Sequence, residues 1–111
     1  MVKQGDIIRL DFDPQIGHEQ KCRRPALVVS NEVFNHFSNL AIVCPITNTN
    51  KKYPFHIKLD KRTKTTGVIL SDQVRTLDII ARNYEFIECI PDDILLEVAD
   101  IINGFFEAVD K

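Results

Sequence analysis

Six short apolar runs, at residues 5–12, 24–30, 40–47, 55–59, 67–76 and 84–90, dominate this sequence. In the first and the fourth run apolar and polar side chains alternate, which is typical of strands with one buried and one hydrated face. Asp13 and Pro14 end the first strand. We expect the run at 67–76 to bend or bulge near Asp72. Many short strands at close spacing predict a mainly β protein built as an antiparallel barrel.

Two segments favour helices instead. Asn31 is a good capping residue, and the apolar residues that follow it predict one or two helical turns with these side chains on one face: Val33, Phe34 and Phe37. Pro91, followed by Asp92 and Asp93, marks the start of a second helix, because acidic residues stabilise the positive end of the helix dipole.

The second helix carries one apolar stripe, formed by Ile94, Leu95, Val98, Ile101, Ile102 and Phe105, and Gly104 weakens its last turn. This apolar stripe could pack on the chain's own barrel or on a partner protein. We expect it to pack on the chain's own barrel.

The length of 111 residues predicts a single domain over residues 1–111. No apolar run is long enough to cross a bilayer, and the N-terminus lacks a signal-peptide core, so we expect a soluble protein that is not exported. Three widely spaced cysteines, Cys22, Cys44 and Cys89, match neither a disulfide framework nor a zinc site. We therefore expect a cytoplasmic location, with Cys44 filling the core.

The charge is unevenly distributed along the chain. Residues 1–84 carry 13 of the 14 basic and 8 of the 16 acidic residues, a net charge of +5, whereas residues 85–111 have a net charge of −7. A basic groove beside an acidic element is compatible with an anionic polymer as ligand. Ordinary charge scatter over a solvated surface is the alternative.

A polar cluster lies between the first two predicted strands. It contains Gly17, His18, Glu19 and Gln20, followed by the sequence Arg23-Arg24-Pro25 at the start of the next strand. Histidine, carboxylate and guanidinium groups held by a rigid sheet are what chemistry on a phosphate requires.

The strings GDIIRLDFDPQIGHEQ, RRPALVVS, AIVCPITN, YPFHIKL and GVILSDQVRTLD, in this order, resemble the MazF/PemK/Kid toxins of bacterial toxin–antitoxin systems. The resemblance extends from Gly5 to about Arg82. It implies a small, twisted SH3-like barrel of the CcdB–MazF type with a short internal helix and a C-terminal helix. It also implies a homodimer that cuts single-stranded RNA at short sequences and is neutralised by a MazE-like antitoxin.

The same resemblance assigns roles to individual residues. It implies that Arg24 and Thr47 are catalytic, with Arg23 a weaker alternative to Arg24. Without the resemblance, Arg24 could be a surface arginine paired with an acid, and Thr47 a strand residue with a local hydrogen bond.

His18 and Glu19 are further catalytic candidates, although some relatives have serine in place of His18. An arginine found in one branch of the family two residues before the position of Asp72 is replaced here by Leu70. The expected RNA-binding residues are Gln20, Asn48, His56, Asp72 and Gln73.

RNA can cleave itself. Its 2′-hydroxyl attacks the neighbouring phosphorus and expels the 5′ oxygen. An enzyme has to supply a base, an acid and cationic donors for the charge on the phosphorane. Arg24 offers a planar, permanently charged fork, and His18, Glu19 or Asp72 could move protons. We expect neither a metal nor another cofactor.

Two other functions remain as alternatives. CcdB toxins share the fold and inhibit DNA gyrase without cutting RNA. An SH3-like peptide-binding module is disfavoured, because the chain has no Trp and only 8% aromatic residues.

Overall fold

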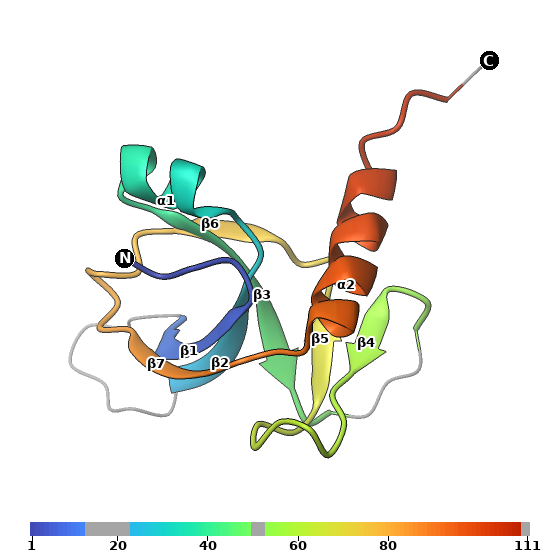
Figure 1. Ribbon diagram of the computed structural model, residues 1–111, viewed down its shortest axis with the longest axis horizontal. Helices are drawn as coiled ribbons and strands as arrows, with labels where there is room; N and C mark the ends of the chain where they lie inside the picture. The colour runs from blue at the N-terminus through green and yellow to red at the C-terminus, as the bar shows by residue number, and fades with distance from the viewer. Residues whose placement is uncertain (13–22, 50–52, 110–111) are drawn as a thin grey trace.

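The computed structural model describes residues 1–12, 23–49 and 53–109 (Figure 1). This part of the chain forms seven strands and two helices: β1 (Asp6–Asp11), β2 (Arg23–Val28), α1 (Glu32–Ser38), β3 (Ala41–Thr47), β4 (His56–Lys58), β5 (Val68–Leu70), β6 (Arg75–Leu77), β7 (Glu85–Cys89) and α2 (Asp92–Gly104). The strand order is β4-β5-β3-β2-β1-β7, with β6 also paired to β3, and every pairing is antiparallel. The predicted mainly β architecture is confirmed.

The predicted strand at 67–76 is two strands, β5 and β6, which pair with different halves of β3. Ile46 and Thr47 at the end of β3 pair with β5, whereas residues 41–43 at its start pair with β6. The amide of Gln73 donates to the carbonyl of Leu70 at 3.0 Å and closes the turn between them. The predicted bend near Asp72 is therefore a tight turn, and it lets one segment follow the twist of β3.

The sheet separates two hydrophobic clusters, one on each face. Ile8 and Leu10 of β1 point into the first cluster, while Ile7 is buried in the second. Ile7 and Ile8 are both fully buried because each of the two faces of the sheet is covered by one of the clusters. The predicted alternation of this strand is confirmed for Ile8, Leu10 and Phe12 against the exposed Arg9, and the pairing of β1 with β7 has a register shift between Ile7 and Ile8.

The predicted first helix is present, and its apolar face is exposed. Asn31 caps it, accepting a hydrogen bond from the amide of Phe34 at 3.0 Å. Val33 is 66% and Phe37 81% exposed, whereas the polar Asn35 is fully buried. The Asn35 amide donates to the carbonyls of Val2 and Ser30, both at 3.2 Å. The inner face of α1 is therefore determined by hydrogen bonds from Asn35 to the distant Val2 and to Ser30 just before the helix.

Helix α2 packs on the chain's own sheet, as expected. Ile94 and Val98 are buried in the second cluster, and Leu95 and Ile102 pack against it. The helix ends at Gly104, and the Phe105 ring beyond it meets the Phe55 ring edge-on, with their centroids 4.9 Å apart.

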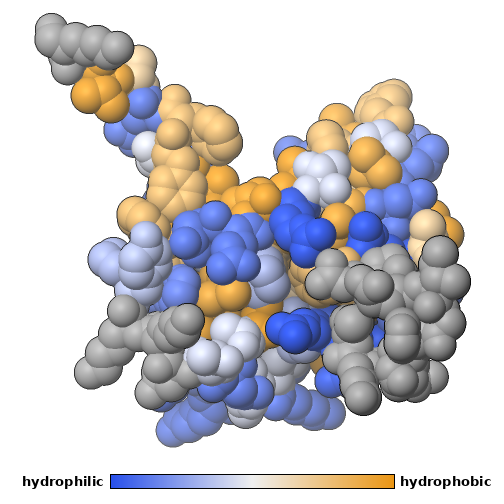
Figure 2. All heavy atoms as spheres, turned by 180° about the vertical axis from the view of Figure 1, so that it is seen from behind, coloured by the Kyte–Doolittle hydropathy of each residue, from blue (hydrophilic) through white to orange (hydrophobic). Residues whose placement is uncertain are grey.

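The apolar surface is concentrated on two projections of the molecule. Figure 2 shows apolar residues on the projecting end of α2 and on the opposite projection, which carries α1. Phe106 and Val109 beyond α2 are 82% and 80% exposed. Among the described helices, none is both long and apolar enough to span a membrane. Cys44 is fully buried in the second cluster, which confirms its predicted place in the core; Cys22 lies outside the described residues.

Candidate active site

Arg24 and Thr47 come together because β2 and β3 are neighbours in the sheet. Ala26 pairs with Pro45, and extending this antiparallel register by two residues places Arg24 opposite Thr47. Both residues line a pocket of about 360 Å³. The other residues around it are Phe12, Pro45, Ile46, Thr49, His56, Leu70, Gln73 and Arg75. Four predicted site residues therefore share one pocket: Arg24, Thr47, His56 and Gln73.

The two adjacent arginines have different environments. Arg23 forms an ion pair with Asp11 at 3.2 Å and lies 3.8 Å from a carboxylate oxygen of Glu85. Arg24 is exposed and has no ion pair or hydrogen bond with another residue of the described chain. Its guanidinium is therefore available to an anionic ligand, whereas that of Arg23 is already occupied.

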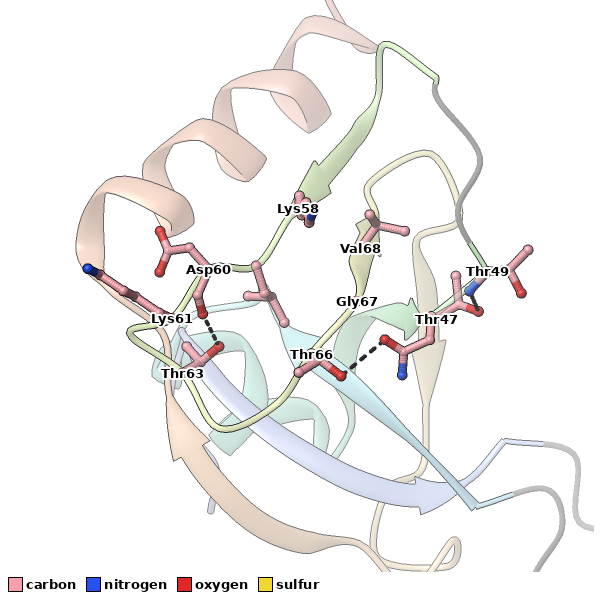
Figure 3. Close-up of a pocket in the computed structure, with 11 residues that line it drawn as sticks. Thr47, Thr49, Lys58, Asp60, Lys61, Thr63, Thr66, Gly67 and Val68 are labelled. Atoms are coloured by element: carbon pink, nitrogen blue, oxygen red, sulfur yellow. Dashed lines mark hydrogen bonds between the residues drawn. The ribbon is translucent and has the colours of Figure 1, made fainter.

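The end of β3 is fixed by contacts with the start of β5. Gly67 has a φ of +118°, and a Cβ atom there would lie 2.9 Å from the carbonyl carbon of Thr47. Thr66 Oγ1 donates to Asn48 Oδ1 at 3.0 Å, and Thr47 Oγ1 accepts the amide of Thr49 at 3.2 Å (Figure 3). Thr47 does make a local hydrogen bond, but as an acceptor, so its hydroxyl still has a proton to donate.

His56 is held beside a carboxylate in the same pocket. Its Nε2 lies 3.4 Å from Asp72 Oδ1, and its side chain is 11% exposed. The centroid of the Tyr53 ring is 5.0 Å from that of the imidazole. The structure thus brings together two of the predicted RNA-binding residues, His56 and Asp72.

Sequence reasoning missed Arg75, the second arginine of the pocket. Its guanidinium carbon lies 5.2 Å from the centroid of the Phe12 ring, a cation–π contact that holds the charge at the pocket wall. The residue is part of the quoted string GVILSDQVRTLD, only three positions after Asp72. The sequence alone does not show the turn at 71–74 or the pairing of Arg75 with Val43. These two features direct β6 back along β3 and bring Arg75 to the pocket.

A larger pocket of about 750 Å³ adjoins the first and shares Thr47 and Thr49 with it (Figure 3). Asn48 and Lys58 also line it. Because Thr66 donates to the Asn48 oxygen, the amide nitrogen of Asn48 is left to donate to a ligand. This pocket combines hydrogen-bond donors with a positive charge.

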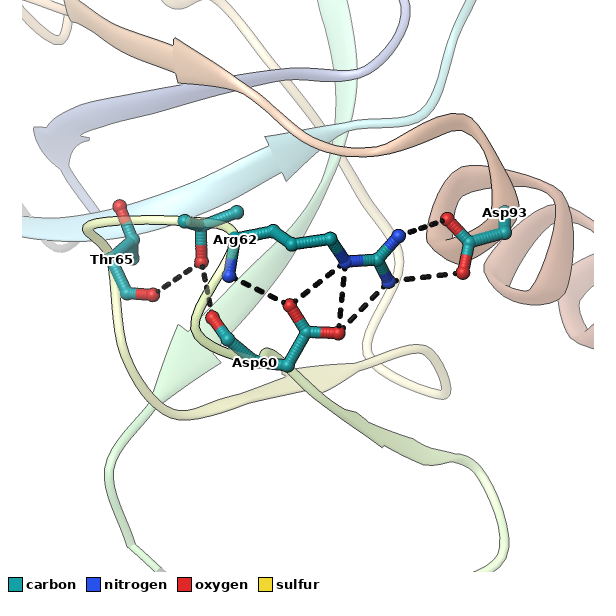
Figure 4. Close-up of polar contacts among 5 residues, drawn as sticks. Asp60, Arg62, Thr65 and Asp93 are labelled. Atoms are coloured by element: carbon teal, nitrogen blue, oxygen red, sulfur yellow. Dashed lines mark hydrogen bonds and ion pairs between the residues drawn. The ribbon is translucent and has the colours of Figure 1, made fainter.

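The loop at 59–67, which borders the larger pocket, is tied to α2 by Arg62. The Arg62 guanidinium binds both carboxylate oxygens of Asp60 and both of Asp93, with distances between 2.8 and 3.2 Å (Figure 4). The hydrogen bonds from Arg62 lower the pKa of Asp60 to about 2 and also lower the pKa of Asp93.

A second carboxylate holds the same loop from β7. Glu88 accepts hydrogen bonds from the amides of Lys64 and Thr65 and from the hydroxyl of Thr65. Although partial burial opposes the change, these hydrogen bonds lower the pKa of Glu88. The loop is therefore anchored at both of its halves.

Several predicted residues are not part of this geometry. His18, Glu19 and Gln20 lie outside the described residues, so their predicted roles remain predictions. Within the described chain, no group of three or more His, Cys, Asp or Glu side chains is placed to hold a metal ion.

Residues 3–106 match the family described as PemK-like, MazF-like toxin of type II toxin–antitoxin system. The chain belongs to this family. Over 101 residues it is 38% identical to Endoribonuclease PemK of Escherichia coli, covering 87% of this chain and 76% of that protein. Over 78 residues it is 40% identical to Endoribonuclease toxin MazF of Escherichia coli K12, covering 70% and 69% of the two chains.

Solved structures of MazF proteins have the same fold as this PemK/MazF family member. A MazE–MazF crystal structure from Deinococcus radiodurans superposes with a TM-score of 0.82 at 31% identity, over 97% of each chain. MazF from the same organism, in another crystal structure, gives a TM-score of 0.82 at 38% identity over 94% of each chain. The resemblance stated from the sequence motifs is confirmed, as is the MazF-type fold.

Proposed function

We propose that this protein is a sequence-specific endoribonuclease toxin that cuts single-stranded messenger RNA without a metal ion and so inhibits translation and growth. The observation that carries the proposal is that the Arg24 guanidinium, which has no ion pair or hydrogen bond within the described residues, lines one pocket together with Thr47 and Arg75. Two cations beside a hydroxyl suit a phosphate whose charge increases in the transition state. Membership of a family whose relatives are named endoribonucleases supports this reading.

The proposed reaction is attack by the RNA 2′-hydroxyl on the adjacent phosphorus, with expulsion of the 5′ oxygen. The products are a 2′,3′-cyclic phosphate and a 5′-hydroxyl. Arg24 binds two nonbridging oxygens through its planar fork, and the Thr47 hydroxyl donates to a nonbridging oxygen. His18 and Glu19 remain additional candidates for proton transfer.

We assign the larger pocket to a nucleotide next to the scissile phosphate. It is continuous with the catalytic pocket through Thr47 and Thr49, and Asn48 and Lys58 present donors to it. Single-stranded RNA fits such a site, because its bases can be splayed apart into separate pockets. Gln73, which lines the catalytic pocket with Thr47, extends the surface along which the RNA strand would bind.

We propose two protein partners. The first is a second copy of this chain, supported by large apolar side chains that are exposed on α1, Val33 and Phe37. The second is a MazE-like antitoxin, supported by the similarity to the MazF chains of MazE–MazF complexes. An acidic, flexible antitoxin segment would compete with RNA for Arg24 and Arg75. The proposed place of action is the cytoplasm, where messenger RNA is found.

The test is cleavage of single-stranded RNA in excess EDTA by the wild type, Arg24→Ala, Arg24→Lys and Arg23→Ala. Both Arg24 variants should lose activity by about a hundredfold or more, since lysine lacks the bidentate fork. Arg23→Ala removes the same charge one residue away and should retain most activity. Activity that appears only after Mg²⁺ is added, or equal losses in Arg23→Ala and Arg24→Ala, would contradict the proposal.

A substrate with one 2′-deoxyribose at the cleavage site tests the nucleophile. It should bind and remain uncut, because the attacking hydroxyl is absent. Thr47→Ala should likewise bind RNA and lose most turnover. If Thr47→Ala abolishes cleavage yet remains toxic in cells, the non-enzymatic gyrase alternative is favoured over the ribonuclease.

A further inference from the structure

The proposed reaction needs a group that takes a proton near neutral pH. Of the described residues that line the catalytic pocket, two are arginines, which stay protonated, and the others apart from His56 have neutral side chains. His56 is the one imidazole among them. A proton acceptor other than the predicted His18 thus lies in the same pocket as Arg24 and Thr47.

The backbone fixes His56 and Asp72 relative to each other. His56 pairs with Leu70 across β4 and β5. The Ser71 amide donates to the Phe55 carbonyl at 3.2 Å, and the turn closed by Gln73 follows directly. These bonds hold Asp72 beside the imidazole, where its Oδ1 is 3.4 Å from Nε2. A histidine oriented by a carboxylate is a recurring arrangement for proton transfer.

The charged and titratable groups around His56 come from several elements. Asp72 lies in the turn between β5 and β6, Arg24 comes from β2, and Arg75 comes from β6. The Tyr53 ring packs against the imidazole from the segment before β4. Among these described neighbours, Asp72 is the one negative charge in contact with the ring.

We propose that His56 is the general base of RNA cleavage and that Asp72 is its positioning residue. This inference rests on the proposed function, and it gives His56 a role in proton transfer rather than in reading the RNA sequence. The neutral imidazole takes the proton of the 2′-hydroxyl as the oxygen forms its bond to phosphorus. The bond from phosphorus to the 5′ oxygen breaks, and that oxygen takes a proton from water. The Asp72 carboxylate stabilises the imidazolium that results, which then returns its proton to solvent.

The pH dependence of kcat/KM tests the role of His56. The wild-type kcat/KM should rise with pH to a plateau, as expected for general-base catalysis. His56→Gln should lose this rise, and its kcat should fall by about a hundredfold to ten-thousandfold. His36→Gln is the matched control, since His36 is exposed on α1 against Phe37, and it should retain both kcat and the pH profile.

A second variant separates a proton carrier from a structural or RNA-reading residue. His56→Ala should regain part of its kcat when free imidazole is added, which no role in packing or base recognition would produce. Asp72→Asn should lower kcat with little change in KM, and Asp72→Glu should restore part of it. Circular dichroism of each variant checks that the fold persists.

The outcomes distinguish this inference from the proposed function. If the wild type does not cut RNA, the proposed function fails. If it does cut RNA and His56→Gln keeps the rise with pH, or loses affinity alone, His56 is not the base. Loss of the rise in His18→Gln instead of His56→Gln would overturn the inference in favour of His18.

Discussion

At the scale of single residues, the site depends on a close backbone contact between β3 and β5. Gly67 adopts a φ of +118°, a conformation that side chains with a Cβ rarely take, and the Thr47 carbonyl fills the space where a Cβ would lie. The position of Thr47 is thus set partly by the absence of a side chain twenty residues later. A catalytic hydroxyl of this kind requires its backbone to be held to within a fraction of an ångström.

Replacing Gly67 with Ala should therefore damage both stability and activity. We expect a loss of about 1–3 kcal/mol in the free energy of unfolding, from the strained backbone conformation. RNA cleavage should fall as well, because the end of β3 must shift. Urea unfolding and a cleavage assay at saturating RNA measure the two effects.

Gly104→Ala is the control for this substitution. No atom lies within 4 Å of a Cβ built at Gly104, which ends α2. Alanine there should stabilise the protein by up to about 1 kcal/mol and leave cleavage unchanged. Equal effects of the two substitutions would argue against the close contact at Thr47.

At the scale of the elements, the loop at 59–67 connects α2 and β7 to the larger pocket. Arg62 links Asp60 in this loop to Asp93 in the first turn of α2, and Glu88 of β7 holds the backbone of Lys64 and Thr65. The loop carries the larger pocket's Thr66 as well as Gly67 at its end. Asp93 of α2 and Glu88 of β7 therefore support the wall of the larger pocket, although neither residue lines it.

The lowered pKa values of these carboxylates predict a loss of stability in acid. A carboxyl group whose pKa is lower in the folded state stabilises the protein above its ordinary pKa, near 4. That contribution is lost as the pH falls through the folded value, which is about 2 for Asp60. Asp93→Asn should lower the thermal midpoint at pH 6 and have a smaller effect at pH 2, where protonation weakens the interaction in the wild type as well.

Glu97→Gln is the matched control on the same helix, since it removes one negative charge from an exposed position of α2. Its thermal midpoint should stay close to that of the wild type at both pH values. If Asp93→Asn lowers the midpoint by the same amount at pH 2 and pH 6, the link through Arg62 does not contribute to the pH dependence.

At the scale of the whole molecule, two hydrophobic clusters lie on opposite faces of one sheet. The first is enclosed by the sheet and closed by residues near the N-terminus, such as Val2. The second is covered by α2 through Ile94 and Val98. Because β3 contributes to both clusters, with Val43 in one and Cys44 in the other, the strand that ends at Thr47 is packed from both faces.

The packing of α2 is tested by comparing two substitutions on the helix. Ile94 is 5% exposed, and Ile94→Ala should lower the free energy of unfolding by about 2–5 kcal/mol. Leu96 is 63% exposed, and Leu96→Ala should change it by no more than about 0.5 kcal/mol. Similar losses in both variants would mean that the outer face of α2 is also covered in solution, as by a second copy.

Much of this architecture could be predicted because its causes are local. Alternation and β-branched residues identified the strands, apart from the division of the segment 67–76 into β5 and β6, and Asn31 and Pro91 marked the helix starts at the positions found. The helical stripe correctly predicted that Ile94 and Val98 are buried. The exposed face of α1 could not be predicted this way, because the burial of Asn35 depends on the carbonyls of Val2 and Ser30.

The sequence by itself determined the strands, the helix starts and the identity of Arg24 and Thr47 as candidates, since these depend on neighbouring residues and on recognisable motifs. The tertiary structure decided which groups meet. The pairing of β2 with β3 brings Arg24 and Thr47 into one pocket, the turn at 71–74 brings Asp72 to His56, and the return of β6 along β3 adds Arg75. Such contacts join residues far apart in the chain, and no local pattern specifies them, because they depend on how the whole sheet twists and pairs.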